Sequence, residues 1–201
     1  VLLSVLVSKD QILFKDRLLV PLYVKYGLSI GYGDNLFKFS DSEKDNFNSY
    51  SYMGESSTYD SSIIKPEVRL LYSPYFGEKL TNFIFYGNIT DYANIEDKDN
   101  QYYSLRFDYK IGPYNWIKVG YKYSNNNFLR YYIDNDIPEQ DYIKCDYRSE
   151  NVYANYSVNL DSYGWSRIQI GNTKHFFNPN FTEFDLNIAE LALTYYYKYK
   201  N

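Results

Sequence analysis

The sequence is poor in the residues that build most metal and catalytic sites. Its 201 residues include one cysteine, Cys145, and one histidine, His175. A single cysteine excludes an internal disulfide framework and a multi-cysteine zinc site, and a single histidine excludes a histidine-rich metal site. The apolar run that a transmembrane helix needs, about 18 residues, does not occur. We therefore expect no metal and no cofactor.

Excess positive charge is also absent. The chain has 21 Lys and Arg against 25 Asp and Glu, a net charge of −4, which disfavours a nucleic-acid partner bound through bulk positive charge. Tryptophan is scarce, with 2 residues, whereas 27 Tyr and 13 Phe raise the aromatic fraction to 21%. So much aromatic surface indicates a folded chain.

The first 20 residues differ from the rest. Residues 1–8 are apolar apart from two serines, and charge begins at Lys9. We interpret 1–20 as a signal-peptide remnant or an N-terminal extension; a first β-strand is the alternative. Residues 21–201 form one predicted domain, which the length allows.

Apolar and polar side chains alternate with period two along this domain. The segment 103–111 is the clearest case, because Tyr, Leu, Phe, Tyr and Ile occupy its odd positions and Ser, Arg, Asp and Lys its even positions. Successive side chains of a strand point to opposite faces, so each such segment predicts a strand with one apolar and one polar face. The predicted strands are eight: 21–33, 63–73, 80–91, 101–112, 116–125, 151–160, 165–174 and 187–199.

Strand length and loop length both indicate a membrane barrel. Most predicted strands reach the roughly 9–11 residues that cross a bilayer. Short connections alternate with longer ones, which is typical of outer-membrane barrels with short periplasmic turns and longer outer loops. The short connections are 74–79, 113–115 and 161–164; the long ones are 34–62 and 126–150, and 92–100 and 175–186 are intermediate.

The same alternation also fits a soluble β-sandwich or a lipocalin-like barrel, in which the apolar face is the core. Three features favour the reverse arrangement, with the apolar face toward lipid. The apolar face is rich in Tyr, whose hydroxyl would need a partner in a dry core. The polar face contains strand glycines, and it carries charges of both signs that a lumen must pair or hydrate.

This orientation predicts two sets of residues. The expected lumen-lining residues are Lys25, Glu67, Arg69, Arg106, Asp108, Lys110, Lys118, Lys122, Arg167 and Glu190. Aromatic side chains near the short turns suit a membrane interface, where the ring is buried and its polar tip is wet. The expected girdle is Tyr72, Tyr114, Trp116, Trp165 and Tyr197.

The two long connections are acidic, with net charges of −4 for 34–62 and −3 for 126–150. They would attract cations at one mouth of the barrel, or they are ordinary solvated loops, the interpretation we favour. Residues 134–141 contain oxygen ligands of the kind calcium prefers, but the EF-hand spacing and its glycine are missing. His175 is expected to line the mouth rather than to catalyse, and we predict no enzymatic activity.

One segment carries a resemblance to a known class. Residues 27–37, Gly-Leu-Ser-Ile-Gly-Tyr-Gly-Asp-Asn-Leu-Phe, precede an acidic, serine-rich loop. They resemble the first strand of Gram-negative outer-membrane β-barrel porins linked to export of polysaccharide or solutes. The resemblance implies an antiparallel up-and-down transmembrane β-barrel in the bacterial outer membrane, with the lipid bilayer and the barrel-assembly machinery as partners.

The end of the sequence departs from that class, whose members usually finish on an aromatic residue. Here Lys200 and Asn201 follow Tyr199, so either two residues overhang or further strands follow. The first functional hypothesis is porin-like passage of small solutes through a charged lumen. The second is a narrow structural or adhesive eight-stranded barrel that acts through its long acidic outer loops. Eight strands leave an interior filled by side chains, whereas about 16 leave a water channel.

Overall fold

The chain forms one antiparallel sheet in the computed structural model, which describes residues 19–45, 53–54, 56–113, 115–133, 142–160 and 164–197. The long strands are β1 (Leu22–Gly33), β2 (Ser61–Tyr72), β4 (Lys79–Tyr92), β5 (Asn100–Gly112), β6 (Asn115–Ile133), β7 (Tyr142–Asn159), β8 (Gly164–Phe177) and β9 (Leu186–Tyr197). The short elements are β3 (Tyr75–Phe76), α2 (Asp41–Asp45), η3 (Glu96–Lys98) and η4 (Thr182–Phe184).

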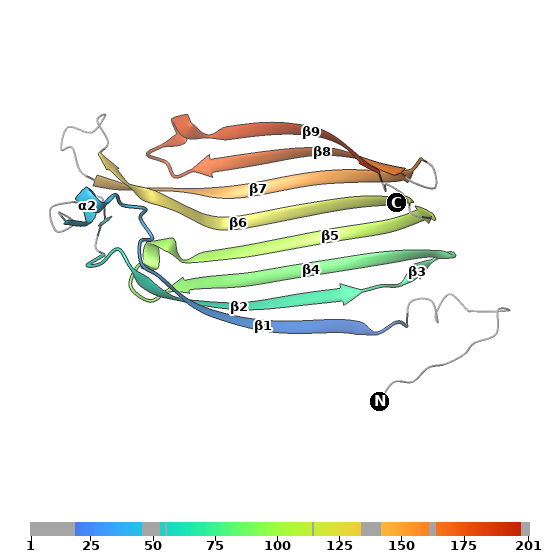
Figure 1. The fold of residues 1–201 in the computed structure, drawn as a ribbon, viewed down its shortest axis with the longest axis horizontal. Helices are drawn as coiled ribbons and strands as arrows, with labels where there is room; N and C mark the ends of the chain where they lie inside the picture. The colour runs from blue at the N-terminus through green and yellow to red at the C-terminus, as the bar shows by residue number, and fades with distance from the viewer. Residues whose placement is uncertain are drawn as a thin grey trace.

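Each long strand pairs with the next one along the chain, in the order β1-β2-β4-β5-β6-β7-β8-β9, and β3 pairs only with β4. Figure 1 shows this meander, with β3 and the turn into β4 at one end of the strands and α2 at the other. At the turn, Gly77 has φ +62°, a backbone conformation that residues with a Cβ adopt at a cost. Among the described residues β1 and β9 pair with no second neighbour, so the sheet is open.

The predicted all-β, antiparallel architecture is confirmed, and eight long strands lie near the predicted positions. The largest difference is the connection predicted at 126–150. Strand β6 continues to Ile133 and β7 begins at Tyr142, so most of this segment is a long hairpin. Register shifts between Ser124 and Asn127 and between Phe128 and Arg130 explain the error. A bulge moves later side chains to the other face and breaks the period-two pattern.

On the central strands, polar side chains are the more buried and apolar side chains the more exposed, which is the reverse of the usual arrangement of a protein in water. On the central strands, Asp108 of β5 is 4% exposed and Ser157 of β7 is 6% exposed. Apolar residues of the opposite parity on β5, β7 and β8 point to the other face and are open: Leu105, Val152 and Ile170 are each more than half exposed. One sheet contains these strands, and in the described part of the chain no second sheet covers the apolar face.

A small apolar core lies at the end of the sheet opposite the short turns. Phe37, Phe39, Met53 and Ile95 are buried there and Phe128 packs against them. Asn35 fixes the entry of this segment, because its side-chain amide donates to the carbonyl of Phe39 at 2.7 Å and its Oδ1 accepts from the Phe39 amide at 2.8 Å. We call this the loop-end core.

Candidate functional site: the polar face of the sheet

Strand register places all the predicted lumen-lining residues on one face. Cross-strand partners share a face, and one row of direct partners runs through Lys25, Arg69, Tyr86, Ser104, Lys122, Asn151, Thr173 and Ile188. The next row toward the short turns contains Arg106, Gly120, Tyr153, Gly171 and Glu190. Beyond it lie Asp108 beside Lys118, and then Lys110 and Arg167. Glu67 lies in the row on the loop side of Lys25.

The polar face has a strong excess of positive charge. By register and alternation it carries Lys25, Lys65, Arg69, Arg106, Lys110, Lys118, Lys122 and Arg167 against Glu67, Asp108 and Glu190. The whole chain, in contrast, has a net charge of −4. The polar face is therefore net positive although the chain as a whole is net negative, and most of the acidic residues lie away from this face.

Two of the three acidic side chains on this face are already engaged. Asp108 Oδ1 lies 2.9 Å from Arg106 Nε. The Tyr86 hydroxyl donates to Glu67 Oε2 at 2.8 Å. In the part of the chain that the structure describes, Arg106 is the only cation of the polar face within ion-pair distance of a carboxylate.

Several remaining cations lie against aromatic rings instead. Lys122 Nζ is 5.1 Å from the ring centre of Tyr153, and Lys110 Nζ is 5.9 Å from that of Trp116. The Arg167 guanidinium carbon is 5.0 Å from the ring centre of Trp165, which stacks on Tyr196. A ring face orients a cation without neutralising its charge.

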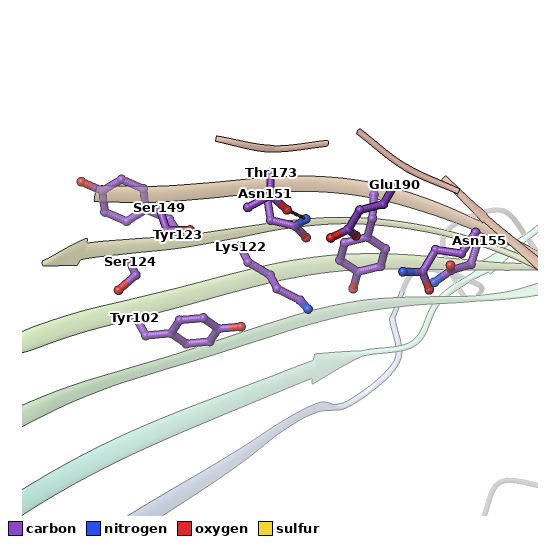
Figure 2. A pocket seen from close by; sticks show the side chains of 11 residues that line it. Tyr102, Lys122, Tyr123, Ser124, Ser149, Asn151, Asn155, Thr173 and Glu190 are labelled. Atoms are coloured by element: carbon purple, nitrogen blue, oxygen red, sulfur yellow. Dashed lines mark hydrogen bonds between the residues drawn. The ribbon is translucent and has the colours of Figure 1, made fainter. Parts of the chain in front are cut away.

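A polar hollow of about 490 Å³ lies on this face. Figure 2 shows Tyr102, Lys122 and Glu190 lining it from β5, β6 and β9. On its wall the Asn151 side-chain amide donates to Thr173 Oγ1 at 2.7 Å. The full lining is Tyr102, Lys122, Tyr123, Ser124, Ser149, Asn151, Tyr153, Asn155, Gln169, Thr173 and Glu190. Hydroxyls, amides and one ion of each sign suit hydrated, polar solutes.

Close packing on this face depends on glycine. A Cβ at Gly120 would lie 2.3 Å from the ring of Tyr153 on the paired strand, whereas a Cβ at Gly31 would meet nothing within 4 Å. Gly120 therefore gives the Tyr153 ring its place beside Lys122. Tyr153 and Asn151 were not among the predicted lumen residues, because that set contained only charged side chains; their alternation in 151–160 carried the signal.

The predicted girdle residues divide between the two faces. Trp116 and Trp165 share the level of the short turns, but cross-strand pairing places them on the polar face, beside Lys110 and Arg167. Tyr72 pairs with Phe83 and stacks on it, on the apolar face. Tyr197 shares the face of Leu193 and Tyr195. Tyr114 lies outside the described residues.

At the loop end, Lys98 of η3 covers the loop-end core. Its Nζ lies 5.3 Å from the ring centre of Phe37 and 4.9 Å from that of Phe128. Burial, together with the charges of Lys38 and Arg130, lowers the pKa of Lys98 to about 8. Nearby, the Tyr131 hydroxyl donates to Asp97 Oδ2 at 2.6 Å, and Lys144 Nζ lies 3.1 Å from Asp97 Oδ1.

The other sequence candidates give no chemical site. His175 packs its ring against Tyr147, with 4.6 Å between ring centres. The possible calcium ligands of 134–141 and most of the predicted segment 1–20 lie outside the described residues. Within the described ranges no group of three His, Cys, Asp or Glu side chains could hold a metal ion. Those ranges also contain no helix with the length and apolarity to span a bilayer.

No family model, no curated protein and no solved structure matches this chain.

Proposed function

We propose that this chain forms the wall of an outer-membrane β-barrel through which small polar solutes pass. In this proposal the apolar face contacts lipid, the polar face lines a hydrated lumen, and the short turns and long loops lie on opposite sides of the membrane. The protein carries no enzymatic activity, and its partners are the lipid bilayer and the machinery that assembles barrels.

The observation that carries the proposal is the reversed exposure of the two faces. In water, an open apolar face over eight strands would be a liability, since soluble monomers rarely expose apolar patches above a few hundred Å². Lipid removes that liability, because hydrocarbon solvates the apolar side chains while the ladder satisfies the backbone. The eight long strands, which have 12 residues or more, are long enough to cross a bilayer core.

The open edges define what the proposal still requires. An unpaired strand cannot face hydrocarbon, because each free N–H or C=O group there costs several kcal/mol. In the described residues β1 and β9 each have one free edge. A barrel therefore needs a partner for each free edge, which β1 and β9 supply to each other in an eight-stranded barrel and further strands supply in a larger one. The transport proposal takes the larger barrel, because it has the width for a water channel.

Single-channel recording tests this function. We expect the native full-length protein, reconstituted in a planar lipid bilayer, to give stable conductance steps. Protein that inserts into vesicles but gives no steps would overturn the transport proposal. That outcome would favour the alternative, a structural or adhesive barrel that acts through the acidic connections at the loop end.

A further inference from the structure

We infer that the turn-side half of the polar face is an anion-attracting zone, so that the solutes passed are preferentially anionic. This inference rests on the proposed function for its meaning in transport, but the zone itself follows from the placement of charges. We define the basic zone as Lys25, Arg69, Lys110, Lys118, Lys122 and Arg167.

The basic zone is separated along the strands from the acidic part of the chain. Its six cations fall in the four rows of cross-strand partners nearest the short turns. The acids in those rows are Asp108, which Arg106 offsets at 2.9 Å, and Glu190. At the other end of the sheet the connections 93–99 and 178–185 each carry a net charge of −2. The turn side of the polar face and the connections at the loop end therefore have opposite electrostatic character.

The charges of the zone are held in place but not cancelled. Rings of Trp116, Tyr153 and Trp165 support three of the cations. No described carboxylate approaches any of the six within ion-pair distance. Like charges gathered on a hollowed surface with low-dielectric walls raise the local concentration of counter-ions. Because the Debye length is about 8 Å at physiological ionic strength, an ion must enter the zone itself to feel this field.

The fixed wall charges, rather than the acidic connections, are expected to set the selectivity. The connections lie at the loop end, where bulk water and salt screen them. The cations of the basic zone belong to paired strands and lie on the face that the solutes pass. Carboxylates and phosphates, which accept hydrogen bonds from Lys, Arg, Tyr and Asn groups, match the chemistry of this lining.

Tryptophan fluorescence reports on the zone directly, because the chain has 2 tryptophans and both lie inside it. In the full-length protein in lipid vesicles, with any tryptophan outside this chain replaced by phenylalanine, we expect iodide to quench this fluorescence strongly and caesium weakly. In the double variant Lys110→Gln/Arg167→Gln the ratio of iodide to caesium quenching should fall about twofold or more, as expected when a local field that gathers anions is removed.

The matched control is Lys174→Gln, on β8 like Arg167. Lys174 pairs with Glu150 and Asn187, on the opposite face from Arg167, so its removal should leave the ratio unchanged. An equal ratio in the wild-type protein and the double variant would overturn the inference. A comparable fall in Lys174→Gln would overturn it too, since the effect would then reflect net charge.

Ion selectivity in planar bilayers gives the second readout. Under a salt gradient the reversal potential should report anions as the more permeant species, and Lys118→Gln/Arg167→Gln should shift it toward cations. A cation-selective wild-type channel would refute the inference while leaving the proposed function intact. Absence of conductance, in contrast, would refute the proposed function, and the quenching ratio would still decide whether the basic zone gathers anions.

Discussion

The two faces of the sheet are built from the same strands, one residue apart, and have opposite chemistry. On β8, Gln169 belongs to the polar face with Asn155, whereas its neighbour Ile170 is 55% exposed on the apolar face. On the polar face, side chains pack on one another through an ion pair, cation–ring contacts and amide hydrogen bonds. On the apolar face, rings and branched side chains cover the sheet without a second layer. The difference teaches that the more buried face of a sheet is not always its apolar face. Whether the buried side chains are polar or apolar indicates whether the other face is suited to water or to lipid.

Placing a charged side chain on the apolar face should lower stability more than any other change considered. In lipid vesicles, Ile170→Arg should lower the free energy of unfolding by about 2–4 kcal/mol, because an arginine at mid-membrane loses its water. The neighbouring change Gln169→Arg, which places the same group on the polar face, should cost much less. Urea unfolding of both variants measures the contrast, and equal costs would contradict the proposed orientation of the faces.

Removal of the Asp108 carboxylate tests whether the polar face is a packed layer. Asp108 is 4% exposed and offsets Arg106, so Asp108→Ala should cost about 1–3 kcal/mol by leaving a cation without its partner. Glu190→Gln, at an exposed position on the edge strand β9, serves as control and should change stability by less than about 0.5 kcal/mol. If both changes were harmless, the Asp108–Arg106 pair would not contribute to the packing of this face.

Glycine substitutions sharpen the same comparison at two positions of the polar face. Gly120→Ala forces the Tyr153 ring to move and should cost about 1–3 kcal/mol through overpacking. Gly31→Ala meets open space and should be close to neutral. Chemical unfolding measures both. An unperturbed Gly120→Ala protein would show that the ring position is not fixed.

The smallest predicted effect lies at the loop end. Because folding lowers the pKa of Lys98 from 10.5 to about 8, the unfolded chain binds more protons between these values. The free energy of unfolding should therefore rise with pH across this window and level off above about 10.5. Lys98→Met should flatten the rise, whereas Lys44→Met in α2 should not. Unfolding midpoints on both sides of the window check this, and an unchanged slope in Lys98→Met would assign the effect to other groups.

Sequence reasoning predicted the strands better than their ends. Period-two alternation located β5 because every second residue of 103–111 is apolar, and it located β8 from the shorter alternation of Ile168 and Ile170 with polar neighbours. It failed on the part of β6 after Ser124 and on the start of β7 that pairs with it, because register shifts interrupt the pattern there. It also could not reveal that β1 and β9 have free edges, since alternation gives the faces of a strand but not its neighbours.

For the candidate site, the charged residues of the polar face were predictable and their contacts were not. Because Lys118 and Lys122 both occupy even positions of the same predicted strand, alternation alone assigned them to one face. The places of Trp116 and Trp165 depended on cross-strand pairing, which sets them against Lys110 and Arg167. Turn proximity suggested a girdle for both tryptophans, yet their side chains belong to the polar face because strand parity, rather than distance from the turn, decides the direction of a side chain.

The most direct test of the central claim is a nitroxide scan along one strand in lipid vesicles. The background is Cys145→Ser, since Cys145 is the chain's one cysteine, and single cysteines are introduced in turn at residues 104–109 of β5. Relaxation by oxygen, which concentrates in lipid, should peak at 105, 107 and 109. Relaxation by a water-soluble nickel chelate should peak at 104, 106 and 108. Oxygen peaks at the even positions, or uniform access of the chelate to both sets, would contradict the assignment of the apolar face to lipid.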